Sequence, residues 1–214
     1  MHKPYSVMIE PVIPVVFSDG RLSEIGIREV FLQAHKIADL QCQSPLEEYA
    51  VFRLLVAIAM DMFRPKRWLD RQELLEAGRF DQETVDAYIA DCEKDGPRFD
   101  LFDPVHPFMQ TAYDPEIDEK AIKPVATLSV SLPSGNNHVF LDHRMESVPV
   151  MTPAEAFRAM ITLYLFCTPG AQEYPSGVNN TPPVYNRILG ESLFSTIILN
   201  MVSSKEMPQL ETNY

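Results

Sequence analysis

The chain has 214 residues, of which 46% are hydrophobic and 22% are charged, a composition typical of a globular protein with material for one sizeable core. Its formal net charge of −12 argues against non-specific coating of DNA, because phosphate affinity depends on lysine and arginine displacing counterions. No apolar run reaches the ~20 residues of a membrane-spanning helix, so we expect no membrane partner.

The N-terminal segments predict a small β element followed by helices. Residues 7–17 are β-branched and carry prolines, and residues 18–21 (SDGR) are a turn signal, which together predict a strand, a turn and a returning strand at a sheet edge. Between Ile27 and Leu40, apolar residues recur at steps of three and four, which predicts one helix. Residues 44–47 (SPLE) form an N-cap signal. The helix that follows is apolar nearly all round, so we expect it to be the central buried helix.

A basic cluster follows this central helix. Arg64, Lys66, Arg67 and Arg71 surround Trp68, the one tryptophan of the sequence. Such a cluster could follow a phosphate backbone. The more ordinary interpretation is a solvated helix start with Trp68 as a packing anchor, and both interpretations stay open.

The middle of the chain predicts a short helix, a packed loop and a strand. Asp81 caps the helix, which extends to Cys92. Residues 98–114 are rich in aromatic residues and prolines, too apolar for a free linker, so we expect an ordered loop. Residues 124–132 (PVATLSVSL) alternate in polarity, which predicts a strand.

Two similar loops are the most distinctive feature of the sequence. PSGNN at residues 133–137 and PSGVNN at residues 175–180 are separated by a predicted helix that Thr152 and Glu155 would cap. Glycine lets a main chain approach a ligand closely, while asparagine offers a donor and an acceptor to sugar or base edges. Such loops could read the shape and the minor groove of a duplex. The alternative is ordinary turn chemistry. The last predicted helix buries a face of Leu193, Phe194, Ile197, Ile198 and Met201.

The sequence gives no positive argument for catalysis, and we expect no enzyme, no metal and no cofactor. Pro104 and Pro107 interrupt any helix that would align Asp100, Asp103 and His106 as metal ligands, and turn chemistry explains the same residues. A second group, His138, Asp142 and His143, lacks a further ligand nearby. The chain carries no nucleophile elbow, phosphate loop or dinucleotide fingerprint.

The cysteines bear on the compartment. Cys42, Cys92 and Cys167 are few, odd in number and far apart, as buried free thiols in a reducing compartment would be. The N-terminus starts basic and turns apolar, but prolines interrupt it and no cleavage site follows. We therefore expect no signal peptide and a cytoplasmic protein.

The order of segments resembles the CasA family, the large subunit of the type I-E CRISPR surveillance complex (Cascade). The resemblance extends from about Ile9 to Val202 and is carried most specifically by residues 99–110 (FDLFDPVHPFMQ) followed by residues 134–143 (SGNNHVFLDH). It implies a non-catalytic subunit that recognises the protospacer-adjacent motif of invading double-stranded DNA. The implied partners are the other Cascade subunits, the crRNA, the target duplex and a nuclease-helicase recruited after target binding, following the general division of labour in guided systems.

The resemblance also implies nucleic-acid-binding positions in both loops. The first loop matches a family loop that ends in a phenylalanine, an aliphatic and a polar residue. The second takes the place of a glycine-rich family loop, although it keeps few of the glycines. The implied positions are Asn136, Asn137, Phe140, Leu141, Asp142, Gly170, Gly177, Asn179 and Asn180.

We therefore expect an α+β fold, predominantly helical, with small antiparallel β elements and long ordered loops. Residues 1–202 would form a CasA-like N-terminal domain, and residues 203–214 a polar tail that begins the continuation seen in the family. Two other functions stay open. The loops could bind protein partners in an interaction-only assembly protein, or the chain could be a small hydrolase that uses His138 or His143.

Overall fold

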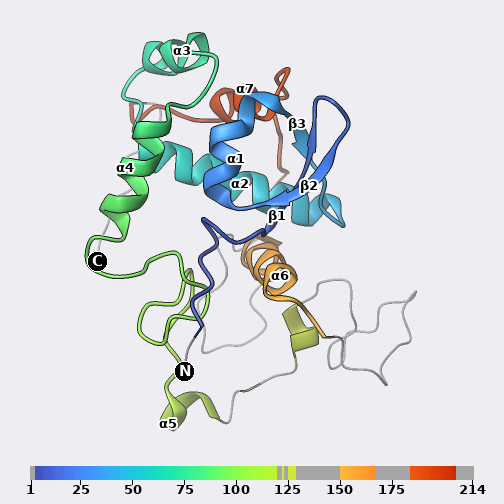
Figure 1. The fold of residues 1–214 in the computed structure, drawn as a ribbon, viewed down its shortest axis with the longest axis vertical. Coiled ribbons are helices and arrows are strands. Elements are labelled where there is room, and N and C mark those ends of the chain that lie inside the picture. The colour runs from blue at the N-terminus through green and yellow to red at the C-terminus, as the bar shows by residue number, and fades with distance from the viewer. Residues whose placement is uncertain (1–2, 120–121, 123–124, 129–149, 167–183, 206–214) are drawn as a thin grey trace.

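The computed structural model describes residues 3–119, 122, 125–128, 150–166 and 184–205, and in it helices pack beside a small antiparallel sheet (Figure 1). This architecture confirms the predicted α+β, predominantly helical fold. The elements in chain order are β1 (Ile13–Phe17), β2 (Leu22–Ile25), α1 (Ile27–Gln33), η1 (Ala34–Lys36), β3 (Ile37–Leu40), α2 (Pro45–Phe63), α3 (Trp68–Glu76), α4 (Gln82–Cys92), α5 (Pro115–Asp118), η3 (Val125–Leu128), α6 (Pro153–Phe166) and α7 (Leu193–Leu199).

The sheet has the strand order β2-β1-β3, and both pairings are antiparallel. The predicted turn between β1 and β2 is confirmed. Gly20 adopts a φ of 84°, in the left-handed region that favours glycine, and the Phe17 amide donates to the Arg21 carbonyl at 2.9 Å. β1 is the middle strand, with Ile13, Val15 and Phe17 in the core.

The prediction of a sheet edge for the proline-bearing strand is wrong, because β1 lies between two neighbours. Pro14 is tolerated there because of where it stands in the register. Pairing of β1 with β3 begins at Val15 and Leu40, and the Pro14 carbonyl accepts from the Gln41 amide at 2.9 Å, just past the end of β3. The missing N–H of proline therefore falls where the ladder ends.

The single helix predicted between Ile27 and Leu40 is also wrong. The helix α1 ends at Gln33, one 3₁₀ turn follows, and the chain then extends into β3. Most of the apolar residues are nevertheless buried, because Ile37 and Leu40 reach the core from the strand, whereas Ala38 is exposed. Spacing alone could not separate the two conformations, since both bury Ile37.

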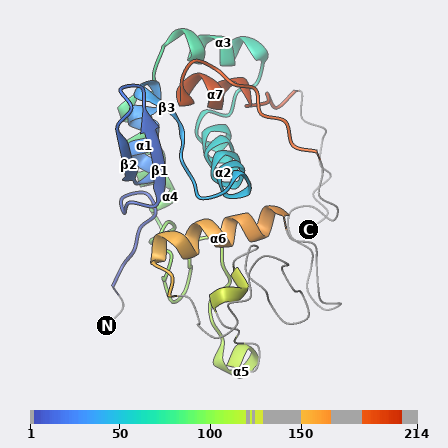
Figure 2. The same cartoon turned by 90° about the vertical axis from the view of Figure 1, so that its right-hand side faces the viewer.

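The helix α2 is the central helix, as predicted. Ser44 caps it by accepting from the Glu47 amide at 3.2 Å, and it ends at Phe63, with Arg64 as the C-cap before Pro65. Figure 2 shows α2 between α6 on one side and α7 on the other, beside the sheet. The core-facing residues of α7 are buried as predicted.

The basic cluster lies on the surface around α3. The Trp68 side chain is 58% exposed, so the prediction of a packing anchor is wrong. Arg64 pairs with Asp61 and Arg67 with Asp70, each at 3.1 Å. These carboxylates offset part of the positive charge that a phosphate backbone would need.

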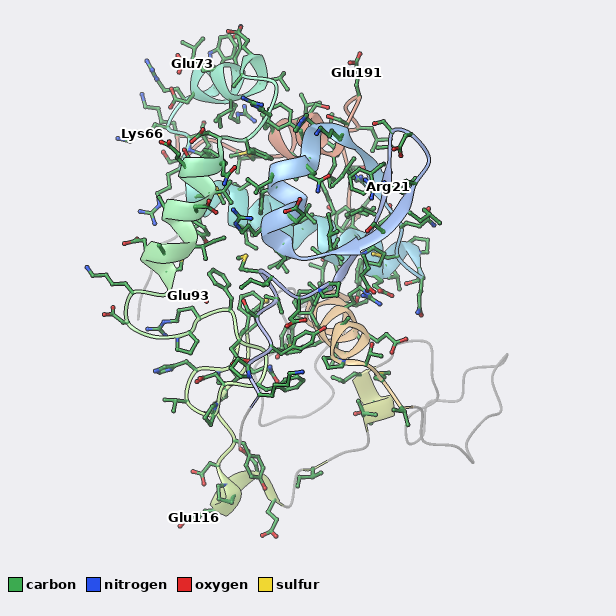
Figure 3. All side chains as sticks on the ribbon, viewed as in Figure 1. Arg21, Lys66, Glu73, Glu93, Glu116 and Glu191 are labelled. Atoms are coloured by element: carbon green, nitrogen blue, oxygen red, sulfur yellow. The ribbon has the colours of Figure 1, made fainter. Side chains whose placement is uncertain are left out.

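Acidic side chains are spread over the outside of the molecule. Figure 3 shows Glu73, Glu93, Glu116 and Glu191 at the periphery of separate elements, and Lys66 near the start of α3.

The helix α4 begins at its predicted cap, where Asp81 accepts from the Thr84 amide at 2.9 Å. Within the described part of the chain, no helix has the length and apolar character that crossing a bilayer requires.

Candidate nucleic-acid interface

All nine predicted contact residues lie outside the described residues. Asn136, Asn137, Phe140, Leu141 and Asp142 belong to residues 129–149, here called the first loop, and Gly170, Gly177, Asn179 and Asn180 belong to residues 167–183, the second loop. The predicted strand over residues 124–132 is described only at Val125–Leu128, where it is wrong, because these residues form a 3₁₀ helix. What the structure does describe is the scaffold on which both loops are mounted.

The helix α6 connects the two loops, and a capping box fixes its start. Glu155 accepts from the Thr152 amide at 2.7 Å, while the Thr152 hydroxyl accepts from the Glu155 amide at 3.2 Å. The amide and the hydroxyl of Thr152 both donate to the Glu155 carboxylate, and these two hydrogen bonds hold the pKa of the Glu155 carboxyl below its usual value. The predicted cap is confirmed, and it fixes the chain direction just after the first loop.

Arg158 attaches α6 to the centre of the protein. Its side chain is only 6% exposed, and its Nε donates to Glu47 Oε1 in α2 at 2.6 Å. Its Nη1 donates to the Val12 carbonyl at 2.8 Å and also to Glu24 in β2. A buried guanidinium with these partners has its charge matched and several of its donors satisfied, which makes the position of α6 specific.

The ordered loop predicted over residues 98–114 is found, and its Phe108 and Met109 contact α6. Phe108 contacts Phe157 of α6 with ring centroids 6.2 Å apart, and the Tyr164 hydroxyl donates to the Met109 carbonyl at 3.0 Å. The same loop is tied to the N-terminal segment, where the Val7 amide donates to the Phe99 carbonyl at 2.9 Å.

The acidic residues of this loop serve the backbone. Asp100 accepts from the Tyr5 amide at 3.0 Å, and Asp103 accepts from the amides of Val105 and His106 at 2.9 Å and 2.6 Å. Those hydrogen bonds lower the pKa of Asp103. This geometry agrees with the turn interpretation, and within the described ranges no three or more His, Cys, Asp or Glu side chains form a group that could hold a metal ion.

The two ends of the second loop lie together on Tyr49 of α2. Phe166, the last residue of α6, and Tyr185 have ring centroids 5.3 Å apart, and the Tyr185 ring lies 4.8 Å from that of Tyr49. The Tyr185 hydroxyl donates to the Leu165 carbonyl at 3.2 Å. The residues on either side of the second loop therefore belong to one aromatic cluster.

Arg187 fixes the returning chain two residues later. Its side chain is 13% exposed, it donates to Glu48 Oε1 at 3.0 Å and to Asp39 in β3, and its guanidinium lies 4.6 Å from the Phe52 ring centroid. Burial and the charge of Asp39 raise the pKa of Glu48, and Arg187 opposes this shift.

The returning chain is also tied to α7. Asn200 accepts from the Ile188 amide at 3.0 Å and donates to the Ile188 carbonyl at 2.7 Å. The Gly190 amide donates to the Thr196 hydroxyl at 3.0 Å. A side chain at Gly190 would collide with Ser195, whose Oγ lies 2.2 Å from the position of an added Cβ. Residues 184–190, here called the return segment, are thus anchored at several points.

The sequence contained a signal for one of these arginines and none for the other. Arg158 is a charged residue on the apolar face of the helix predicted from Thr152, so a buried partner could have been sought for it. Arg187 stands between Asn186 and Ile188 in a segment with no clear periodicity, and its partners are distant in the chain. Only the fold brings Arg187 to Glu48 and Asp39.

Comparison with known proteins gives one consistent family. A sequence model described as CRISPR-associated protein Cse1 matches residues 7–213. The CasA/Cse1 protein of Thermus thermophilus is 34% identical over 205 residues, which cover 92% of this chain and 39% of that relative.

Solved structures agree with the sequence comparison. The crystal structure of Thermobifida fusca Cse1 matches with a TM-score of 0.76 at 26% identity, over 94% of this chain and 39% of that one. A chain of a pre-nicking CRISPR RNA-guided surveillance complex matches with a TM-score of 0.72 at 25% identity, over 93% of this chain and 43% of that one. The present chain spans about two fifths of the length of these relatives.

Proposed function

This chain belongs to the CRISPR-associated Cse1 (CasA) family, and we propose that it serves as a non-catalytic part of a crRNA-guided surveillance complex. In this role it recognises the protospacer-adjacent motif of double-stranded DNA through its two loops. It helps to recruit a nuclease-helicase after target binding. Its partners are the other Cascade subunits, the crRNA and the target duplex.

The main support for the proposal is that both loops are attached to one helix, α6, at its two ends. The first loop ends just before the capping box of α6, and the second loop begins after Phe166 at the other end of α6. A rigid helix that delivers two amide-bearing loops can present them to one ligand in a fixed relation. Arg158 and the aromatic cluster around Tyr49 supply the rigidity.

The acidic character of the chain is compatible with this role. Uncharged main-chain and asparagine groups read a groove by hydrogen bonding and need no net positive charge on the protein that carries them. The long-range attraction for DNA then comes from the guide complex as a whole, whose other subunits supply the positive field.

An experiment separates motif recognition from the alternative of a protein-only assembly role. The complex is reconstituted with this chain carrying Asn136→Ala, Asn137→Ala, Asn179→Ala and Asn180→Ala, and both co-purification and binding to duplexes with randomised flanks are measured. Gln72→Ala with Gln82→Ala serves as the control, because these amides are exposed on α3 and α4. The proposal predicts lost flank preference with assembly retained in the loop variant, whereas lost assembly alone would support the alternative.

A further inference from the structure

Two consecutive glutamates in the first turn of α2 receive two arginines from opposite sides of the second loop. Glu47 binds Arg158, which precedes the loop on α6, and Glu48 binds Arg187, which follows the loop in the return segment. We propose that Arg158 and Arg187 are positioning residues that fix both ends of the second loop to this turn. The DNA part of this inference rests on the proposed function.

The ion pairs of Arg158, here called the first clamp, join α6 to one edge of the sheet. Arg158 contacts Glu47 at 2.6 Å and also binds Glu24 of β2, an edge strand. The Arg158 side chain is only 6% exposed, so its guanidinium is buried among these partners. The C-terminal half of α6, which leads into the second loop, therefore cannot slide along α2 without separating a buried charge from its partners.

The ion pairs of Arg187, here called the second clamp, join the return segment to the other edge of the sheet. Arg187 contacts Glu48 at 3.0 Å and also binds Asp39 of β3, the opposite edge strand. The Phe52 ring lies beneath its guanidinium at 4.6 Å. A planar guanidinium held by two carboxylates and a ring has a defined orientation, which a lysine in its place would not reproduce.

The arrangement differs from a general stabilising ion pair in what it connects. Both clamps meet at one turn of α2, whose own start is fixed by Ser44, and each continues to a different strand. The separation of the two loop ends is thereby set by α2 and the two edge strands. Holding the ends of a loop at fixed positions restricts its conformations and lowers the entropy lost when it binds a ligand.

The test uses Arg187→Met, Arg187→Lys and a matched control, Arg28→Met. Arg28 makes a bidentate ion pair with Asp86 at 2.7 Å and 3.0 Å, which joins α1 to α4 and contacts neither loop end. Two quantities are measured. The first, measured on the full chain, is amide hydrogen exchange at Ile188 and Gly190, whose N–H groups are hydrogen-bonded. The second, measured in the reconstituted complex, is flank discrimination.

We expect Arg187→Met to speed exchange at Ile188 and Gly190 at least tenfold while exchange in α1 and α4 is unchanged, and to reduce flank discrimination about tenfold. Arg187→Lys should fall between Arg187→Met and the native chain. Arg28→Met should speed exchange in α1 and α4 only and leave discrimination intact. Equal exchange of the return segment in Arg187→Met and Arg28→Met would overturn the inference. If the native complex shows no flank discrimination, the proposed function fails, and the exchange result alone decides the positioning role.

Discussion

Phe166 and Tyr185 stand at the two ends of the second loop, and their rings meet edge to face with centroids 5.3 Å apart. This contact brings together the residues on either side of the second loop. The ring of Tyr49 lies 4.8 Å from Tyr185 and joins the pair to α2. The position of the loop ends therefore depends on packing that substitutions outside the loop can change.

Tyr185→Ala should destabilise the chain by about 2 kcal/mol, because it removes the ring contacts with Phe166 and Tyr49 and leaves a gap between them. Tyr185→Phe keeps the rings and loses the hydrogen bond to the Leu165 carbonyl, so its cost should be about 1 kcal/mol or less. Urea unfolding of both variants measures whether Tyr185→Ala loses more unfolding free energy than Tyr185→Phe. Equal losses would show that the hydroxyl, not the ring, supplies the stability.

Arg158→Met should lower the free energy of unfolding by about 3 kcal/mol, because it leaves the largely buried carboxylate of Glu47 without its partner. Adding Glu47→Met should recover part of this loss, since the orphaned charge is then removed as well. A double-mutant cycle by denaturant unfolding measures the coupling. Strictly additive losses would mean that the two side chains do not interact in solution.

Thr152→Ala should cost about 1 kcal/mol, the usual value of a helix N-cap, because Thr152 accepts from the Glu155 amide at 3.2 Å. The pKa of Glu155 is lowered in the folded state, so its contribution to stability is present above the unfolded pKa of about 4.3 and is lost as the pH falls through the folded pKa. The stability difference between native chain and Glu155→Gln should therefore shrink on acidification from about pH 6 to about pH 3. A difference that grows over this range would contradict the cap.

Cys42 should react slowly with alkylating reagents at pH 8. Burial, together with the charge of Glu47, raises the pKa of its thiol to about 12, although Arg158 opposes the shift. The thiolate is the reactive form, so only a minute fraction is available at that pH. Mass spectrometry of the folded chain, with the urea-unfolded chain as control, measures the rate. Equal labelling rates in the folded and unfolded chains would refute this environment.

The sequence predicted best where structure is set locally. The Ser44 and Thr152 caps and the turn at Gly20 depend on residues within a few positions of one another, and all three are found. The helix expected up to Leu40 failed because burial of Ile37 is equally possible from a strand. Pro14 misled in the same way, since the end of the neighbouring strand cannot be read from β1 itself.

Much of the candidate interface could not be predicted because it depends on contacts between distant segments. Arg187 meets Glu48 and Asp39 only after α2 and β3 have come together. Packing of Trp68 was the more ordinary of two interpretations, but α3 has no buried residue and leaves Trp68 exposed. The nine residues expected to contact nucleic acid lie outside the described ranges and remain predictions from the family resemblance.

The central claim is that uncharged groups of the two loops read the flank of a duplex. Its most direct test is the ratio of Kd values for duplexes with a scrambled and with a preferred flank, measured for reconstituted complexes containing the native chain or the four-asparagine variant. We predict that the native ratio is at least tenfold and that the variant ratio falls close to one while assembly is retained. A variant that assembles and keeps the native ratio would contradict the account.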